Sequence, residues 1–204
     1  MVQYYSSFNK PTICIPNGID IDKVPILKTT GNNNNIIKFF FIGTPGLPWH
    51  GVDLIEKIAE KLPEYEFHIV GLNGKSRLKN VFYYGFMSYN EYVKILKECH
   101  ICIGTLALHR KNSKEASPLK VREYLAHGFP TIIGYKDTAF LEQKPDFILE
   151  IDLSDENVSD EVIYKIKEFA LKNKNRVVNH EEVRNFIDIN VLEQKKVEFI
   201  KKLI

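Results

Sequence analysis

The most informative feature of the sequence is a helix start that suits an anionic ligand. Ser117 is typical of a helix N-cap and Pro118 of a first helical turn. The helix expected to begin there, closing near His127, has free backbone N–H groups at Leu119 and Lys120. Aligned amides and the helix dipole attract a phosphate group. Lys120 adds a full positive charge where the dipole alone disfavours a cation, and this indicates an anion site.

Two carboxylates accompany this helix start. The expected packing face of the helix consists of Val121, Tyr124, Leu125 and Gly128. Glu123 therefore lies on the far side of the helix and Glu115 in the loop before it, so both carboxylates can face one cleft. The same residues also fit an ordinary surface helix with solvated Lys, Arg and Glu side chains, because exposed charges usually need no functional explanation.

Further polar residues follow two of the expected strands. The strand Ile36–Gly43 runs into a loop that contains His50, and the strand Ile101–Gly104 runs into a loop that contains Arg110. Ligands of parallel sheets bind beyond the carboxyl ends of the strands, so a protonated His50 and Arg110 are candidates for the anion site. A basic surface loop, and a packed pair of His50 with Trp49, fit the same residues.

Alternating strands and helices position these residues. Short apolar runs rich in β-branched and aromatic residues predict buried strands, and apolar residues three and four apart predict helices. We expect strands at Thr12–Pro16, Ile36–Gly43, Glu66–Gly71, Ile101–Gly104, Thr131–Gly134 and Phe147–Ile151, and helices at 52–62, 88–98 with a capping box at its start, 118–127 and from Ser159 onward. This alternation predicts an α/β fold with a Rossmann-like, doubly wound, mostly parallel sheet and helices on both faces.

Composition and short motifs exclude several classes of function. A net charge of +2 gives no field strong enough to indicate nucleic acid binding. Three cysteines cannot form a disulfide framework, and Cys99-His100-Ile101-Cys102 lacks a second ligand pair for zinc, so we expect buried structural thiols. Asp20-Ile21-Asp22 lacks a third acid and predicts no metal site. The polar run Lys28–Asn35 predicts an exposed connection, and no segment approaches the length of a membrane span.

The segment Glu115–Pro130 resembles the E-x7-E motif of glycosyltransferase family 4, in an S-P-L-K variant. Three other segments resemble that family in order and spacing, namely Ile15–Asp20, Thr44–Asp53 and Tyr83–Ser88. The resemblance extends from about Thr12 to Phe140 and implies the sugar-nucleotide-binding half of a GT-B enzyme.

The resemblance implies roles for individual residues. Glu115 would be the catalytic-site carboxylate that contacts the donor sugar, Glu123 would bind the ribose, and the amides of Leu119 and Lys120 would bind the diphosphate. The other implied donor-binding residues are Gly43, Thr44, His50, Gly51, Gly85, Phe86, Arg110 and Ser117. Many members carry Arg and Lys where Thr44 and His50 stand, so other groups must neutralise the diphosphate here.

The resemblance also implies a reaction and a division of the chain. A retaining glycosyltransferase would move a hexose from a nucleotide-sugar to a glycan or lipid-linked acceptor in polysaccharide biosynthesis, without cofactor or metal. It would work in the cytoplasm or at the inner face of the membrane. The acceptor site would belong to a missing N-terminal domain, with residues 1–11 as a linker remnant, 12–188 as the donor domain and 189–204 as a helix that crosses to the missing domain.

Other classes of function remain open from the sequence. A GT-B-like sugar-nucleotide epimerase would have the same architecture. A non-enzymatic Rossmann-like module would use its basic C-terminal helix to dock a partner or an anionic membrane. A dinucleotide-dependent oxidoreductase is disfavoured, because Gly43–Pro48 does not match G-x-G-x-x-G.

Overall fold

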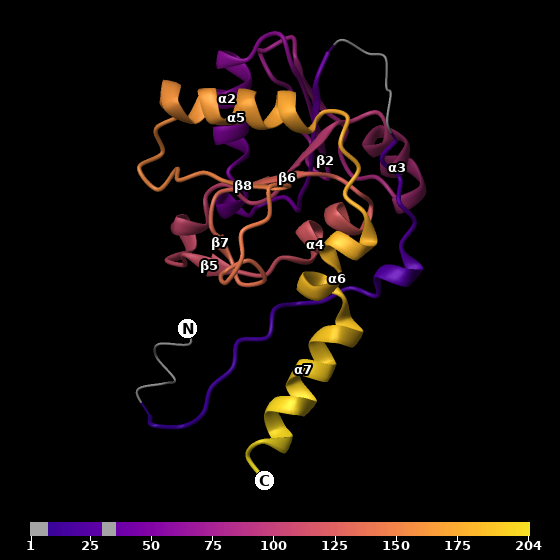
Figure 1. Ribbon diagram of the computed structural model, residues 1–204. Helices are drawn as coiled ribbons and strands as arrows, with labels where there is room; N and C mark the ends of the chain where they lie inside the picture. The colour runs from indigo at the N-terminus through magenta and orange to yellow at the C-terminus, as the bar shows by residue number, and fades with distance from the viewer. Residues whose placement is uncertain (1–7, 30–35) are drawn as a thin grey trace.

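The computed structural model describes residues 8–29 and 36–204 of the chain (Figure 1). Residues 1–7 of the expected linker 1–11, and residues 30–35 of the expected connection 28–35, lie outside the described residues. The strands are β1 (Lys38–Ile42), β2 (Glu66–Val70), β3 (Val81–Tyr83), β4 (Ile101–Ile103), β5 (Glu115–Ala116), β6 (Thr131–Ile133), β7 (Lys136–Asp137) and β8 (Ile148–Glu150). The helices are α2 (Val52–Lys61), α3 (Tyr89–Lys97), α4 (Leu119–Ala126), α5 (Asp160–Asn173), α6 (His180–Ile187) and α7 (Ile189–Lys201), with 3-10 turns η1 (Ile21–Lys23), η2 (Pro48–His50) and η3 (Leu108–Lys111).

Six of the strands form one parallel sheet. Their order is β3-β2-β1-β4-β6-β8, and every pair of neighbours is parallel. From β1, the strands β2 and β3 thus follow one another toward one edge of the sheet. The chain then crosses to the other side of β1, where β4, β6 and β8 follow one another toward the opposite edge. This is the order of the Rossmann fold, and it confirms the α/β class expected from the alternation of strands and helices.

Helices cover both faces of this sheet. Phe39 and Phe41 of β1 pack in one hydrophobic cluster with α2 and α5, whereas Phe40 packs in another with α3 and α4. Successive side chains of a strand point to opposite faces, so a continuous apolar run such as β1 serves both layers. Figure 1 shows α5 and α2 on one side of the sheet and α3 and α4 on the other.

Two expectations for the N-terminal part are wrong. Thr12–Pro16 forms no strand, because its extended backbone has no strand beside it, and the chain first pairs at an isolated bridge between Ile19 and Asp188. Lys28, expected in an exposed connection, is 4% exposed. Its ammonium donates to the carbonyl oxygens of His100 at 2.5 Å and Lys174 at 3.0 Å, which offsets the cost of burying the charge.

The cysteines behave as structural thiols. Cys99 and Cys102 are buried and free, as the sequence predicts. Burial raises the pKa of the Cys99 thiol well above its usual value, so the thiolate needed for redox or metal chemistry is disfavoured.

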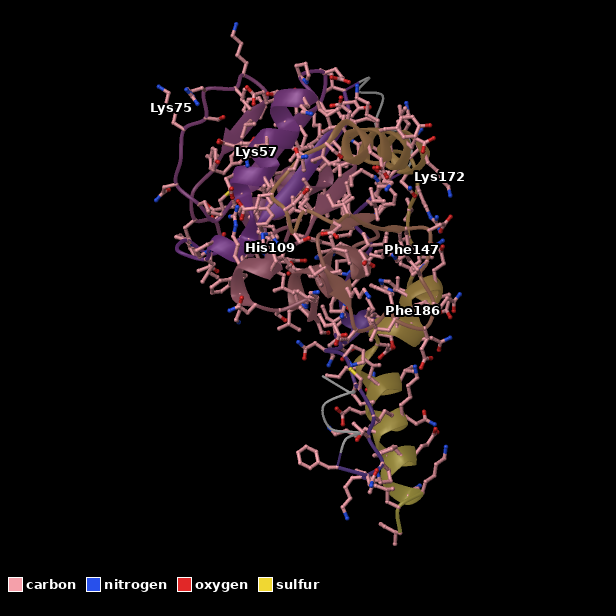
Figure 2. All side chains as sticks on the ribbon, turned by 90° about the vertical axis from the view of Figure 1, so that its left-hand side faces the viewer. Lys57, Lys75, His109, Phe147, Lys172 and Phe186 are labelled. Atoms are coloured by element: carbon pink, nitrogen blue, oxygen red, sulfur yellow. The ribbon has the colours of Figure 1, made fainter. Side chains whose placement is uncertain are left out.

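The C-terminal helix leaves the body of the domain. Figures 1 and 2 show α7 projecting away from the sheet, with Phe186 of α6 near the junction. Leu192 is buried, but Val197, Ile200 and Leu203 are exposed, so these three apolar side chains of α7 are not covered by the described residues.

Candidate functional site

A cleft opens at the carboxyl ends of β1 and β2. The strand order reverses between β1 and β4, and ligands of open α/β sheets bind at such a switch point. The cleft has a volume of about 340 Å³ and is lined by Ile42, Gly43, Thr44, Pro45, His50, Val70, Gly71, Phe86, Met87 and Lys120. A larger groove of about 850 Å³ lies between Thr12–Pro16, α6 and α7. We assign the ligand site to the smaller cleft, because it lies at the carboxyl end of β1, which borders the switch point, whereas the larger groove does not.

Two glycines form the floor of the cleft. The N–H of Gly43 donates to the carbonyl of Val70 at 3.0 Å, and the N–H of Gly71 donates to that of Gly85 at 2.7 Å. Gly71 has a φ of +86°, and a Cβ there would overlap the carbonyl oxygen of Gly43. Glycine is therefore required at Gly71 by both conformation and space, and it lets the backbone at Gly71 approach that of Gly43 closely.

Lys120 reaches into this cleft from the first turn of α4. Its ammonium donates to the carbonyl oxygen of Ile42 at 2.7 Å, lies 4.5 Å from the centre of the Phe41 ring, and is 3.5 Å from Nε2 of His50. No carboxylate forms an ion pair with it among the described residues, and burial lowers its pKa to about 7. Even partial burial of a cation without an acidic partner is costly, so this arrangement favours an anionic ligand.

His50 is not the cation that the sequence suggested. It is buried in η2, where its ring packs edge-on against Phe41 at 5.6 Å. Burial, and then the neighbouring charge of Lys120, lower the pKa of His50 to about 4. The expectation that a protonated His50 neutralises the ligand is therefore wrong, since the imidazole is neutral near pH 7 and offers Nε2 as an acceptor.

Arg110 forms its ion pairs outside the cleft. Its guanidinium binds both carboxylate oxygens of Asp53, at 2.8 and 2.7 Å, and Oε1 of Glu156 at 2.7 Å. His109, labelled in Figure 2, lies 3.3 Å from the same Glu156 oxygen. Arg110 does not line the cleft, so Lys120 supplies the positive charge there.

The helix start differs in detail from the expected one. Pro118, not Ser117, is the N-cap residue, and α4 begins at Leu119. The reason is that the Ser117 hydroxyl accepts hydrogen bonds from the backbone N–H of Asn17 at 2.7 Å and from Arg122 at 2.6 Å. The amides of Leu119 and Lys120 still stand at the first turn, where an α-helix has no internal acceptor for them.

Arg122 excludes the reading of α4 as a solvated surface helix. Its side chain is 0% exposed and binds both carboxylate oxygens of buried Asp137, one of them at 2.9 Å. It also donates to the carbonyl of Asn17 at 2.8 Å. This network ties together α4, β7 and the chain near Asn17, and it fixes where α4 begins.

The two candidate carboxylates lie outside the lining of the cleft. Glu115 is in β5, not in a loop, and pairs in register with Lys136 of β7. Glu123 is partly buried on α4 and accepts a hydrogen bond from the Tyr92 hydroxyl of α3. The structure thus brings together Gly43, Thr44, His50, Phe86 and Lys120, with Gly51 and Gly85 next to them in the chain, but not Glu115, Glu123, Arg110, Ser117 or Leu119.

Several lining residues were missed by sequence reasoning. Gly71 carried a usable signal, because it follows the second buried strand as Gly43 follows the first. Pro45 and Met87 lie within the segments Thr44–Asp53 and Tyr83–Ser88 that the sequence analysis singled out, but only the packing of β1, β2 and the chain near Phe86 brings them and Val70 together.

The described part of the chain contains neither a cluster of metal-ligating side chains nor a helix that could span a membrane. No group of three or more His, Cys, Asp or Glu side chains there is placed to hold a metal ion. None of its helices combines the length and apolarity needed to span a membrane.

Residues 52–185 match a family described as glycosyl transferase-like. No curated protein matches the sequence. Solved structures share the fold. A lipopolysaccharide outer core galactosyltransferase in its apo form matches with 15% identity and a TM-score of 0.68, over 94% of this chain and 56% of that one. Sucrose-phosphate synthase from Thermosynechococcus elongatus matches with 14% identity and a TM-score of 0.68, over 99% and 55%.

An alpha-glucosyltransferase in complex with UDP and a DNA 13-mer matches with 15% identity and a TM-score of 0.67, over 98% of this chain and 61% of that one. The chain therefore spans little more than half the length of each of these structures. At such identities the likeness establishes the fold, which is one half of the GT-B architecture.

Proposed function

Because the chain belongs to the glycosyl transferase-like family, we propose that its cleft binds the nucleotide-sugar donor of a retaining glycosyltransferase of family 4. The observation that carries this proposal is the partly buried ammonium of Lys120, which lies in the cleft without a carboxylate partner among the described residues. UDP is bound in the similar alpha-glucosyltransferase structure, and a diphosphate is an anion of the kind that Lys120 favours.

The proposed pose places the diphosphate between Lys120 and the backbone at Gly43 and Thr44. The first-turn amides of α4 and the helix dipole add to the positive potential, so the leaving diphosphate needs no metal ion. The sugar would extend toward Glu115 and the ribose toward Glu123. Phe86, which is 90% exposed at the rim of the cleft, offers a flat face to the base.

The acceptor side of the reaction belongs to the same proposal. Transfer needs the donor and a glycan or lipid-linked acceptor held in a near-attack geometry, and this chain covers only about half of a GT-B structure. We propose that a second domain carries the acceptor and packs against the exposed apolar residues of α7. The reaction would belong to polysaccharide biosynthesis, in the cytoplasm or at the inner face of the membrane. The exposure of Val197, Ile200 and Leu203 supports this docking role for α7.

Calorimetric titration with UDP-, GDP- and ADP-sugars tests the proposed function. We expect one nucleotide class to bind the chain, with modest affinity because the donor stays partly hydrated on its open side. We expect no sugar transfer by the chain alone to glycan or polyprenyl-phosphate acceptors. Failure of all three nucleotide classes to bind would contradict the donor-site proposal, and transfer by the chain alone would contradict the need for a second domain.

Replacing Glu123 should separate ribose binding from structure. Glu123→Ala removes a charge-assisted hydrogen bond to the ligand, so affinity should fall by roughly tenfold or more. The same change removes the bond from Tyr92, and Tyr92→Phe is the matched control because it loses that bond but keeps the carboxylate. Equal affinities of the two variants would show that Glu123 only holds Tyr92.

A further inference from the structure

Lys120, which is partly buried, differs from the buried cations Arg122 and Lys28 in the groups that compensate its charge. Arg122 has the carboxylate of Asp137, and Lys28 has two close carbonyl oxygens. Lys120 has one close acceptor, the carbonyl oxygen of Ile42, and a distant one in His50. An ammonium has three N–H donors, so at least one donor of Lys120 is left to a ligand in the cleft.

The groups that face Lys120 do not supply a compensating charge. From η2 comes His50, which is neutral, and from β1 come Phe41 and the backbone of Ile42. On α4 itself, Glu123 is bonded to Tyr92, and the Tyr124 hydroxyl accepts from the N–H of Ile42 at 3.0 Å. The β2 side contributes Val70 and Gly71, which have no charge.

We propose that the donor diphosphate charges Lys120, so that binding of a nucleotide-sugar takes up a proton from solvent onto the Lys120 amine. This inference rests on the proposed function. Within the protein the ammonium contacts the carbonyl oxygen of Ile42, the face of the Phe41 ring and, at 3.5 Å, Nε2 of His50, and none of these groups carries a negative charge. A bound diphosphate would place negative charge beside it. The balance is one amine and one solvent proton giving one ammonium.

The direction of the pH dependence follows from the pKa. Burial lowers the pKa of free Lys120 to about 7, and a neighbouring anion raises the pKa in the complex. Well below pH 7 the amine is protonated in both the free and the ligand-bound protein, so binding takes up almost no protons. Above pH 7 the free amine is mostly neutral and the bound one charged, so uptake appears and the affinity declines as pH rises.

Calorimetry in buffers of different ionisation enthalpy measures this proton uptake directly. The probe is UDP-glucose, or the GDP- or ADP-glucose that binds better, because the diphosphate of a nucleotide-sugar does not titrate near neutral pH. With a free pKa of about 7, we expect roughly half a proton or more per ligand at pH 8 and close to none at pH 6.

Lys120→Arg is the matched variant, since a guanidinium stays charged at both pH values. It should bind the same probe without proton uptake and with an affinity that no longer falls between pH 6 and 8. Titration of the lysine side-chain resonances of the free wild-type chain by NMR is the second readout, and it should show one amine titrating near pH 7.

The outcomes separate the inference from the function on which it rests. Binding of the probe by the wild type with no uptake at pH 8, or uptake that persists in Lys120→Arg, overturns the inference and leaves donor binding intact. No binding of any nucleotide-sugar overturns the proposed function and the inference with it.

Discussion

Lys120→Met should abolish most nucleotide-sugar binding while leaving the domain at least as stable as the wild type. The variant keeps the length of the side chain but removes the cation of the cleft. A hydrogen bond to a charged group contributes about 1.5–3 kcal/mol, so the affinity should fall by roughly tenfold to a hundredfold. Titration calorimetry at pH 6.5 with the best-binding nucleotide-sugar measures the loss.

The expected stability of Lys120→Met follows from the same pKa. The pKa of Lys120 is about 7 when folded and near the ordinary value of 10.5 when unfolded. Between these values the unfolded chain binds more protons, so stability rises with pH across this window, and below pH 7 the full cost of burying the charge is present. Removing the amine relieves that cost, so the melting temperature at pH 6.5 should not fall. A lower melting temperature with unchanged affinity would show that Lys120 stabilises the fold and does not bind the ligand.

Asp137→Ala should be the most destabilising single change at the base of α4. It leaves the guanidinium of Arg122 buried without its carboxylate, and breaking a buried ion pair in this way typically costs about 3–5 kcal/mol. For a domain of this size, each kcal/mol lowers the melting temperature by about 2–4 °C. Thermal and urea unfolding followed by circular dichroism measure the change.

Asp146→Ala is the matched control for Asp137→Ala. Asp146 also pairs with an arginine, Arg176, but its side chain is 54% exposed, so its loss should cost about 1 kcal/mol or less. The double variant Arg122→Met with Asp137→Leu should recover much of the stability, because no unpaired charge remains buried. Equal destabilisation by Asp137→Ala and Asp146→Ala would contradict the role given to the buried pair.

Local sequence signals predicted the sheet and most helices well. The apolar run at Phe39–Phe41 requires cover on both faces and thereby indicated a parallel sheet. The capping box at Ser88 is a pattern of neighbouring residues, and it begins α3 as expected. Such signals predict secondary structure well because the interactions behind them form between residues of the same helical turn or the same strand.

The site was predicted less completely, because its chemistry depends on distant partners. The residues that neighbour Arg122 in the sequence do not indicate that its side chain is buried. Its partner Asp137 is brought to it only by the packing of β7. The neutrality of His50 arises from burial under Phe41 and from Lys120, which is 70 residues away. Thr12–Pro16 has the composition of a strand but no neighbouring strand, and a strand exists only as a pair.

The position of Lys120 in the first turn of α4 was predicted, but the direction of its side chain was not. A cation in the first turn of a helix indicated an anion site, because the dipole alone disfavours it there. The sequence could not show that the Lys120 side chain reaches the carbonyl oxygen of Ile42 and thereby lines the cleft.

Mapping of a bound nucleotide-sugar by amide chemical shifts tests the central claim most directly. A 15N-labelled chain titrated with the UDP-, GDP- or ADP-sugar that binds should show its largest shifts at Gly43, Thr44, Gly71 and Lys120, around the lining of the cleft. Shifts confined to the groove between Thr12–Pro16 and α7, or saturating binding that leaves the signals of Gly43 and Lys120 unmoved, would contradict the placement of the donor site at the switch point of the sheet.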